Sequence, residues 1–220
     1  MKELSLIQEY FVCAVNEKGK LSAFSMERQV CLVAAGLLEL KLEGCIGIEN
    51  KKAAVTGELP EDRGYLKPLY DYLNQGKPVK LEKVVSDYNG SMTGRRMNEL
   101  VDAVGGWLAG EGAVQAEQAG MFDGCQRYVP DRYALERTIE KLRAELLGEG
   151  ELSGDTAALV LLLEKGKCLK DYFSRYEQKQ MRERLAAVMS SEDGRLVKRL
   201  VESTDDNLVI TIATLVSDFM

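Results

Sequence analysis

The chain of 220 residues contains no histidine. It therefore lacks the imidazole that Ser-His-Asp and Cys-His catalysis, histidine-containing zinc sites and histidine pH switches require. Its five cysteines are an odd number at wide spacings, without a Cys-x-x-Cys pair. This argues against a disulfide framework or a thiolate metal site, so we expect reduced cysteines, no metal and no cofactor.

Long hydrophobic runs are also absent. The longest apolar stretches, 30–38 and 157–163, are far shorter than the ~20 residues that a membrane-spanning helix needs. The first residues lack the apolar segment and cleavage site of a signal peptide. We therefore expect a cytoplasmic chain that touches a membrane only from outside.

The charge is unevenly distributed along the chain. The net charge of −6 argues against a general nucleic-acid binder. Residues 63–96 nevertheless hold seven basic and three acidic side chains, whereas residues 110–164 hold five basic and eleven acidic ones. The first segment indicates a basic face suited to an anionic surface, and the alternative is a solvated face without a partner.

Hydrophobic residues recur at helical spacing through most of the sequence. The pattern predicts helices over 4–15, 25–43, 91–109, 131–147 and 153–164, with further helices toward 219. Asp131 and Ser153 stand where N-caps belong. The order helix, glycine, short strand, turn, short strand occurs twice and predicts β-hairpins over 45–55 and 113–129. We expect a mostly α protein, one compact helical-bundle domain over 1–220 with two short, winged-helix-like hairpin units.

Five stretches carry a resemblance to a known family. They are LSLIQEYF at 4–11, EKG at 17–19, GLLELKLEGCI at 36–46, LAGEGAV at 108–114 and ALVLLL at 158–163. Together they resemble the Golgi phosphoprotein 3 family. The resemblance implies a non-enzymatic, peripheral membrane adaptor that binds phosphatidylinositol 4-phosphate. We expect a compact, bacterial-type member without the basic N-terminal tail.

The resemblance also implies a phosphate pocket, made by a tryptophan before the first core helix, an arginine within it and two arginines opening a later helix. Phe24 and Val33 fall at the first two positions, and Asn98 and Val101 fall at the paired arginines. The nearest basic residues are Arg28, in the first core helix, and Arg95 and Arg96, one turn before Asn98. The residues that we predict to bind a lipid headgroup are Phe24, Arg28, Arg95, Arg96 and Asn98.

Two further features bear on ligands and partners. Arg95 and Arg96 stand at a predicted helix start, where backbone N–H groups and the helix dipole favour an anion. Met121 and Phe122 stand at or near the predicted tip of the second hairpin, which the resemblance implies is used for self-association. We expect membrane insertion there or a homo-oligomer through the 113–129 hairpin, and burial under the same domain is the alternative.

Other functions remain open at this point. A protein–protein scaffold of the same fold that has lost lipid binding is the main alternative, because none of the implied arginines aligns in register. A winged-helix DNA regulator is disfavoured, since the helices before the hairpins carry Glu39, Glu43, Glu99 and Asp102. No nucleophile and base form a recognisable pair, so we expect no enzyme.

Overall fold

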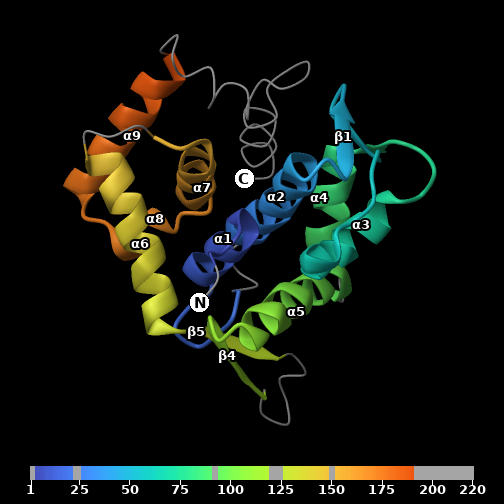
Figure 1. Ribbon diagram of the computed structural model, residues 1–220, viewed down its shortest axis with the longest axis horizontal. Coiled ribbons are helices and arrows are strands. Elements are labelled where there is room, and N and C mark those ends of the chain that lie inside the picture. Colours follow the sequence, from blue (N-terminus) through green and yellow to red (C-terminus); the bar gives the residue numbers. More distant parts are fainter. Residues whose placement is uncertain (1–2, 22–25, 91–93, 119–125, 149–151, 191–220) are drawn as a thin grey trace.

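Two antiparallel helices form the centre of the molecule (Figure 1). The structure is a computed structural model that describes residues 3–21, 26–90, 94–118, 126–148 and 152–190. Every residue of α1 (Leu6–Ala14) is buried, and α2 (Met26–Leu42) is buried from Val30 to Leu40. The helices predicted over 4–15 and 25–43 are confirmed, and both lie in the core.

The remaining helices surround this pair on two sides (Figure 1). On one side lie η1 (Glu61–Leu66), α3 (Lys67–Leu73), α4 (Leu81–Asn89) and α5 (Arg95–Gly110). On the other side lie α6 (Arg132–Leu147), α7 (Gly154–Lys165), α8 (Leu169–Tyr172) and α9 (Arg175–Ser190). Their buried apolar side chains join one hydrophobic core, which confirms the mostly helical fold class.

Both predicted hairpins are present. β1 (Ile46–Glu49) pairs antiparallel with β2 (Lys52–Val55), and β4 (Val114–Glu117) pairs with β5 (Arg127–Pro130). A short strand that the sequence did not reveal, β3 (Val79–Lys80), adds to β2.

The same turn leads into each hairpin. Gly44 after α2 and Gly112 after α5 have φ of +73° and +75°, in the left-handed region that favours glycine. One residue later, the Cys45 N–H donates to the Leu40 carbonyl and the Ala113 N–H donates to the Leu108 carbonyl. Both helices thus end in a Schellman motif that turns the chain into a strand.

The second hairpin packs closely on α5. A Cβ at Gly105 would lie 2.5 Å from the Tyr128 ring, so only glycine allows this approach. The Tyr128 hydroxyl donates to Asp102 Oδ1 at 3.1 Å. These contacts hold α5 against the second hairpin.

Several local predictions are tested by the structure. The Asp131 and Ser153 side chains accept backbone N–H groups at the starts of α6 and α7, which confirms both N-caps. Cys13, Cys31, Cys45 and Cys168 are buried and free. Among the described residues, no helix is both long and apolar enough to span a bilayer. The predicted helices after 193 lie outside the described residues.

Candidate functional site

The start of α5 presents two adjacent arginines. Its N-cap is Gly94, with φ of +60°, and no side chain of a described residue caps the first turn. The Arg95 side chain is 82% exposed, and its Nε donates to Glu99 Oε1 at 2.7 Å. An exposed pair of this i,i+4 type contributes only about 0.3–0.5 kcal/mol, so a stronger anion can replace Glu99.

Arg96 lies beside an open groove of about 780 Å³ between α3 and α5. Its guanidinium carbon is 5.3 Å from the centroid of the Tyr72 ring, a cation–π contact that uses none of its N–H donors. Burial and a hydrogen bond to Asp87 raise the pKa of Tyr72 to about 12, so the ring stays neutral. Among the described residues, Arg96 donates no hydrogen bond, which leaves its donors available to a ligand.

The other predicted headgroup residues fall in different places. Asn98 lies in the same first turn of α5, next to Gly94. Arg28 lies in the first turn of α2, where Nη1 donates to the Ala14 carbonyl at 2.8 Å and Nη2 pairs with Asp171 of α8. The structure therefore brings Arg95, Arg96 and Asn98 together, while Arg28 joins three helices of the bundle.

Three predicted residues are not tested by the structure. Phe24, Met121 and Phe122 lie outside the described residues. Val33, at the position where the resemblance implies an arginine, is completely buried in α2. That position offers no charge to a phosphate.

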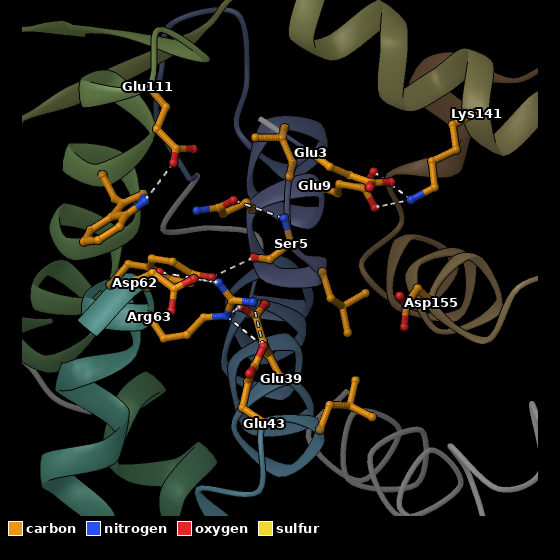
Figure 2. A pocket seen from close by; sticks show the side chains of 16 residues that line it. Glu3, Ser5, Glu9, Glu39, Glu43, Asp62, Arg63, Glu111, Lys141 and Asp155 are labelled. Atoms are coloured by element: carbon orange, nitrogen blue, oxygen red, sulfur yellow. Dashed lines mark hydrogen bonds and ion pairs between the residues drawn. The ribbon is translucent and has the colours of Figure 1, made fainter. Parts of the chain in front are cut away.

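The other end of α5 borders a cavity of about 440 Å³ (Figure 2). Carboxylates dominate its lining, with two basic side chains, Arg63 and Lys141, among them. The seven acidic residues are Glu3, Glu9, Glu39, Glu43, Asp62, Glu111 and Asp155. The lining thus has a formal net charge of −5. A phosphate pocket needs a charge of the opposite sign.

Arg63 is the centre of one ion-pair group in the cavity. Its Nη2 lies 2.7 Å from Glu43 Oε1, its Nη1 lies 2.9 Å from Asp62 Oδ2, and its Nε lies 3.8 Å from Glu39 Oε1. Only 23% of the Arg63 side chain is exposed. One guanidinium therefore links η1 to the C-terminal end of α2 (Figure 2).

Glu39 forms the buried floor of this group. The Ile7 N–H donates to its Oε2 at 3.0 Å, and the Tyr65 hydroxyl donates to its Oε1. Burial raises the pKa of Glu39, and these hydrogen bonds partly oppose that rise. The carboxylate is held at the N-terminus of α1, where the helix dipole favours a negative charge.

A second ion pair lies on the opposite side of the cavity (Figure 2). Lys141 of α6 donates from Nζ to both carboxylate oxygens of Glu9, at 3.0 and 3.1 Å. Burial raises the pKa of Glu9, while the Lys141 charge lowers it. This pair joins α1 to α6 across the bundle.

Aromatic side chains complete the wall at the end of α5. The Trp107 indole N–H donates to Glu111 Oε1 at 3.2 Å, and the Tyr65 ring meets the indole edge-on at a centroid distance of 5.3 Å. Gly64 permits this packing, because a Cβ there would lie 3.2 Å from the indole. Trp107, which is partly buried against the core, thus also lines the cavity.

The charges at both ends of α5 oppose its dipole. Arg95 and Arg96 stand at the positive N-terminal end, and Glu111 is the C-cap at the negative end. Each such placement costs about 0.3–1 kcal/mol, and a bound ion of opposite sign relieves it. The helix is thus suited to an anion at its start and to a cation at its end.

The sequence patterns did not reveal the cavity. Its residues come from segments far apart in the chain, and the unassigned stretch 56–90 supplies Arg63 and Tyr65. One signal was available: Glu9 and Glu39 are carboxylates within stretches that are otherwise buried and mostly apolar, where a charge needs partners. Within the described part of the chain, no His, Cys, Asp and Glu side chains are grouped to hold a metal ion.

The comparisons with known proteins agree with the fold. The family model of Golgi phosphoprotein 3 (GPP34) matches residues 6–204, nearly the whole chain. No curated protein matches the chain. The matched range includes both helix–glycine–hairpin units and both ends of α5. The chain belongs to the Golgi phosphoprotein 3 family.

Proposed function

We propose that this protein is a non-enzymatic, peripheral membrane adaptor that binds an anionic phospholipid headgroup at the start of α5. The observation that carries this proposal is the adjacent pair Arg95 and Arg96 on a first turn whose N-cap, Gly94, supplies no capping side chain. The backbone N–H groups and positive dipole of a helix start, together with two guanidiniums, favour a phosphate. Family membership supports an adaptor role.

Binding of an anion at the first turn of α5 breaks few existing interactions. Arg95 gives up only one exposed pair with Glu99, and Arg96 needs no partner exchange because it donates no hydrogen bond to a described residue. Near an anionic surface each basic residue contributes about 1 kcal/mol. A phosphoinositide such as phosphatidylinositol 4-phosphate offers more charge per headgroup than phosphatidylserine and is the preferred ligand of this proposal.

A protein–protein scaffold without lipid binding is the second candidate. Two observations favour it: Val33 is completely buried, and Arg28 is already bonded to Ala14 and Asp171. Two of the positions that would complete a phosphate pocket are therefore occupied by structural contacts. The two candidates differ in one measurable property, the affinity for anionic vesicles.

Flotation with liposomes separates them. The protein is mixed with neutral phosphatidylcholine vesicles, with vesicles that contain phosphatidylserine, and with vesicles that contain phosphatidylinositol 4-phosphate. Each mixture is measured at low salt and at an ionic strength of about 0.15 M. We expect flotation with the phosphoinositide that persists at the higher salt, and weaker, salt-sensitive flotation with phosphatidylserine.

A charge reversal tests the residues. Arg95→Glu with Arg96→Glu should reduce vesicle affinity at least about tenfold. The matched control is Arg132→Glu with Arg137→Glu on α6, which makes the same charge change at exposed positions. Arg132 even repeats the Arg95 geometry, with Nε 2.7 Å from Glu136 Oε1. Equal loss in both variants, or no flotation of the unmodified protein, would contradict the proposal.

A further inference from the structure

We propose that the cavity at the C-terminal end of α5 binds an organic cation, an ammonium or guanidinium group on an alkyl stem. The site is separate from the arginine pair at the start of the helix. This inference does not depend on lipid binding, because it rests on different residues and on the opposite charge.

The cavity has the size and construction of a ligand site. Its volume of about 440 Å³ lies within the range of about 300–1,000 Å³ typical of small-molecule pockets. Its walls come from α1, the C-terminal ends of α2 and α5, η1, α6 and α7, and ion pairs tie several of these together (Figure 2).

The cavity already binds both kinds of cationic group internally. Its carboxylates hold the guanidinium of Arg63 through Glu43 and Asp62, and they hold the ammonium of Lys141 through Glu9. These two cations balance only two of the seven carboxylates in the lining, so the cavity keeps an excess of negative charge.

Among the residues that the structure describes, neither Glu3 nor Glu111 has a cation as its partner. Glu3 makes no ion pair with them, and the one hydrogen bond that Glu111 accepts on its side chain from them comes from the Trp107 indole N–H. Glu111 also stands at the negative end of the α5 dipole, where a cation is favoured independently of the carboxylates. Asp155 needs no such partner, since it lies in the first turn of α7.

The uncharged part of the wall suits an alkyl stem and a cation beside an aromatic ring. Leu42 is 43% exposed and lines the cavity together with Leu4. Trp107 offers the ring that attracts cations most strongly. Its N–H donates to the Glu111 carboxylate, which increases the electron density of the ring and so strengthens that attraction. A metal ion would use neither feature.

The sole tryptophan of the chain makes the test direct, because Trp107 lines the cavity. The probe is agmatine, which carries a guanidinium and an ammonium on one alkyl chain. We expect a saturable change in Trp107 fluorescence, and calorimetry should give the same Kd. N-carbamoylputrescine, in which a neutral ureido group replaces the guanidinium, should bind about tenfold more weakly.

Conservative variants identify the residues. Glu3→Gln with Glu111→Gln removes two charges but keeps an acceptor for the indole N–H, and it should weaken agmatine binding at least about tenfold. The matched control, Glu99→Gln with Glu136→Gln, removes two exposed charges outside the cavity and should leave binding unchanged. Circular dichroism spectra and unfolding midpoints of both variants establish that they fold.

A second ligand distinguishes the sources of the cation. Acetyl-arginyl-lysine amide carries the same groups on a peptide. Tighter binding of agmatine assigns the cavity to a free small molecule, and tighter binding of the peptide assigns it to basic side chains of a protein. Absence of a saturable signal with both ligands, or equal binding by the Glu3/Glu111 variant and the unmodified protein, would overturn the proposal.

Discussion

The arginines at the start of α5 and the charged groups at its end are held in different ways. Arg95 is exposed and has one weak ion pair, and Arg96 rests on a tyrosine ring. At the other end, Arg63 is largely buried and lies near three carboxylates. The charges at the start of the helix are therefore accessible to a ligand, whereas most charges at the cavity form ion pairs that stabilise the fold.

The largest expected effect comes from breaking the cavity frame. Arg63→Leu leaves Glu39, Glu43 and Asp62 facing one another without their shared cation, and it should lower the free energy of unfolding by about 2–3 kcal/mol. Urea unfolding followed by circular dichroism measures this. Arg95→Leu is the comparison variant and should change stability by less than about 0.5 kcal/mol. Similar losses in both would remove the distinction between the two ends.

The ion pair across the bundle should have the next largest effect. Lys141→Leu leaves the buried Glu9 without its cation and should cost about 2 kcal/mol. Adding Glu9→Gln to Lys141→Leu should restore much of that loss, because the uncompensated charge is then gone. A double-mutant cycle in urea gives the coupling energy. Additive effects of the two substitutions would show that the pair is not coupled.

The raised pKa of Glu39 predicts a smaller, pH-dependent effect. A carboxyl whose pKa is raised on folding binds its proton more tightly in the folded state. Its contribution to stability is therefore present at low pH and is lost as the pH rises from the unfolded value of 4.5 through the folded pKa. Glu39→Gln removes this titration, keeps one amide oxygen as an acceptor for the Ile7 N–H, and leaves its NH2 group to donate to the Tyr65 hydroxyl. The variant should gain on the order of 1 kcal/mol relative to the unmodified protein between acidic and neutral pH.

Unfolding curves at a series of pH values test this prediction. The difference between the two proteins isolates Glu39, because the other titrating carboxyls are common to both. Arg63, Glu43 and Tyr65 surround the group and are unchanged in the variant. A difference in stability that does not vary with pH would show that Glu39 titrates at the same pH in the folded and unfolded chain.

The smallest expected effect on stability is at the start of α5. Arg95→Ala removes an exposed pair and a charge that opposes the helix dipole, so the two effects nearly cancel and stability should stay within about 0.5 kcal/mol. Vesicle affinity should fall nonetheless. Thermal unfolding and flotation of the same sample measure both properties. A large change in the unfolding midpoint would mean that Arg95 has a structural role.

Local signals predicted the helices and turns well. The apolar spacing of α1 and α2, the glycines after α2 and α5, and the caps Asp131 and Ser153 each act within a few residues, so the sequence shows them directly. The resemblance to the Golgi phosphoprotein 3 family is confirmed as family membership. The stretch 56–90, with its short helices and a two-residue strand, lacked a long periodic pattern.

The cavity was beyond such signals because it depends on tertiary contacts. Glu9 and Lys141 are 132 residues apart in sequence, and their pairing follows only from the packing of α6 against α1. Trp107 shows the same limit: the sequence places it in the predicted helix 91–109, and only the fold shows that it lines a hollow. The arginine pair could be predicted from the sequence as a motif. Whether the two guanidiniums can bind a ligand depends on their contacts with Tyr72 and Glu99, which only the structure shows.

Backbone amide NMR of the protein titrated with two small ligands tests the central claim most directly. Inositol 1,4-bisphosphate, the headgroup of phosphatidylinositol 4-phosphate, should shift the amides of Arg95 to Asn98. Agmatine should shift those of Trp107 to Glu111, at the other end of the same helix. Shifts by both ligands at one end, or by neither at α5, would contradict the assignment of opposite charges to its two ends.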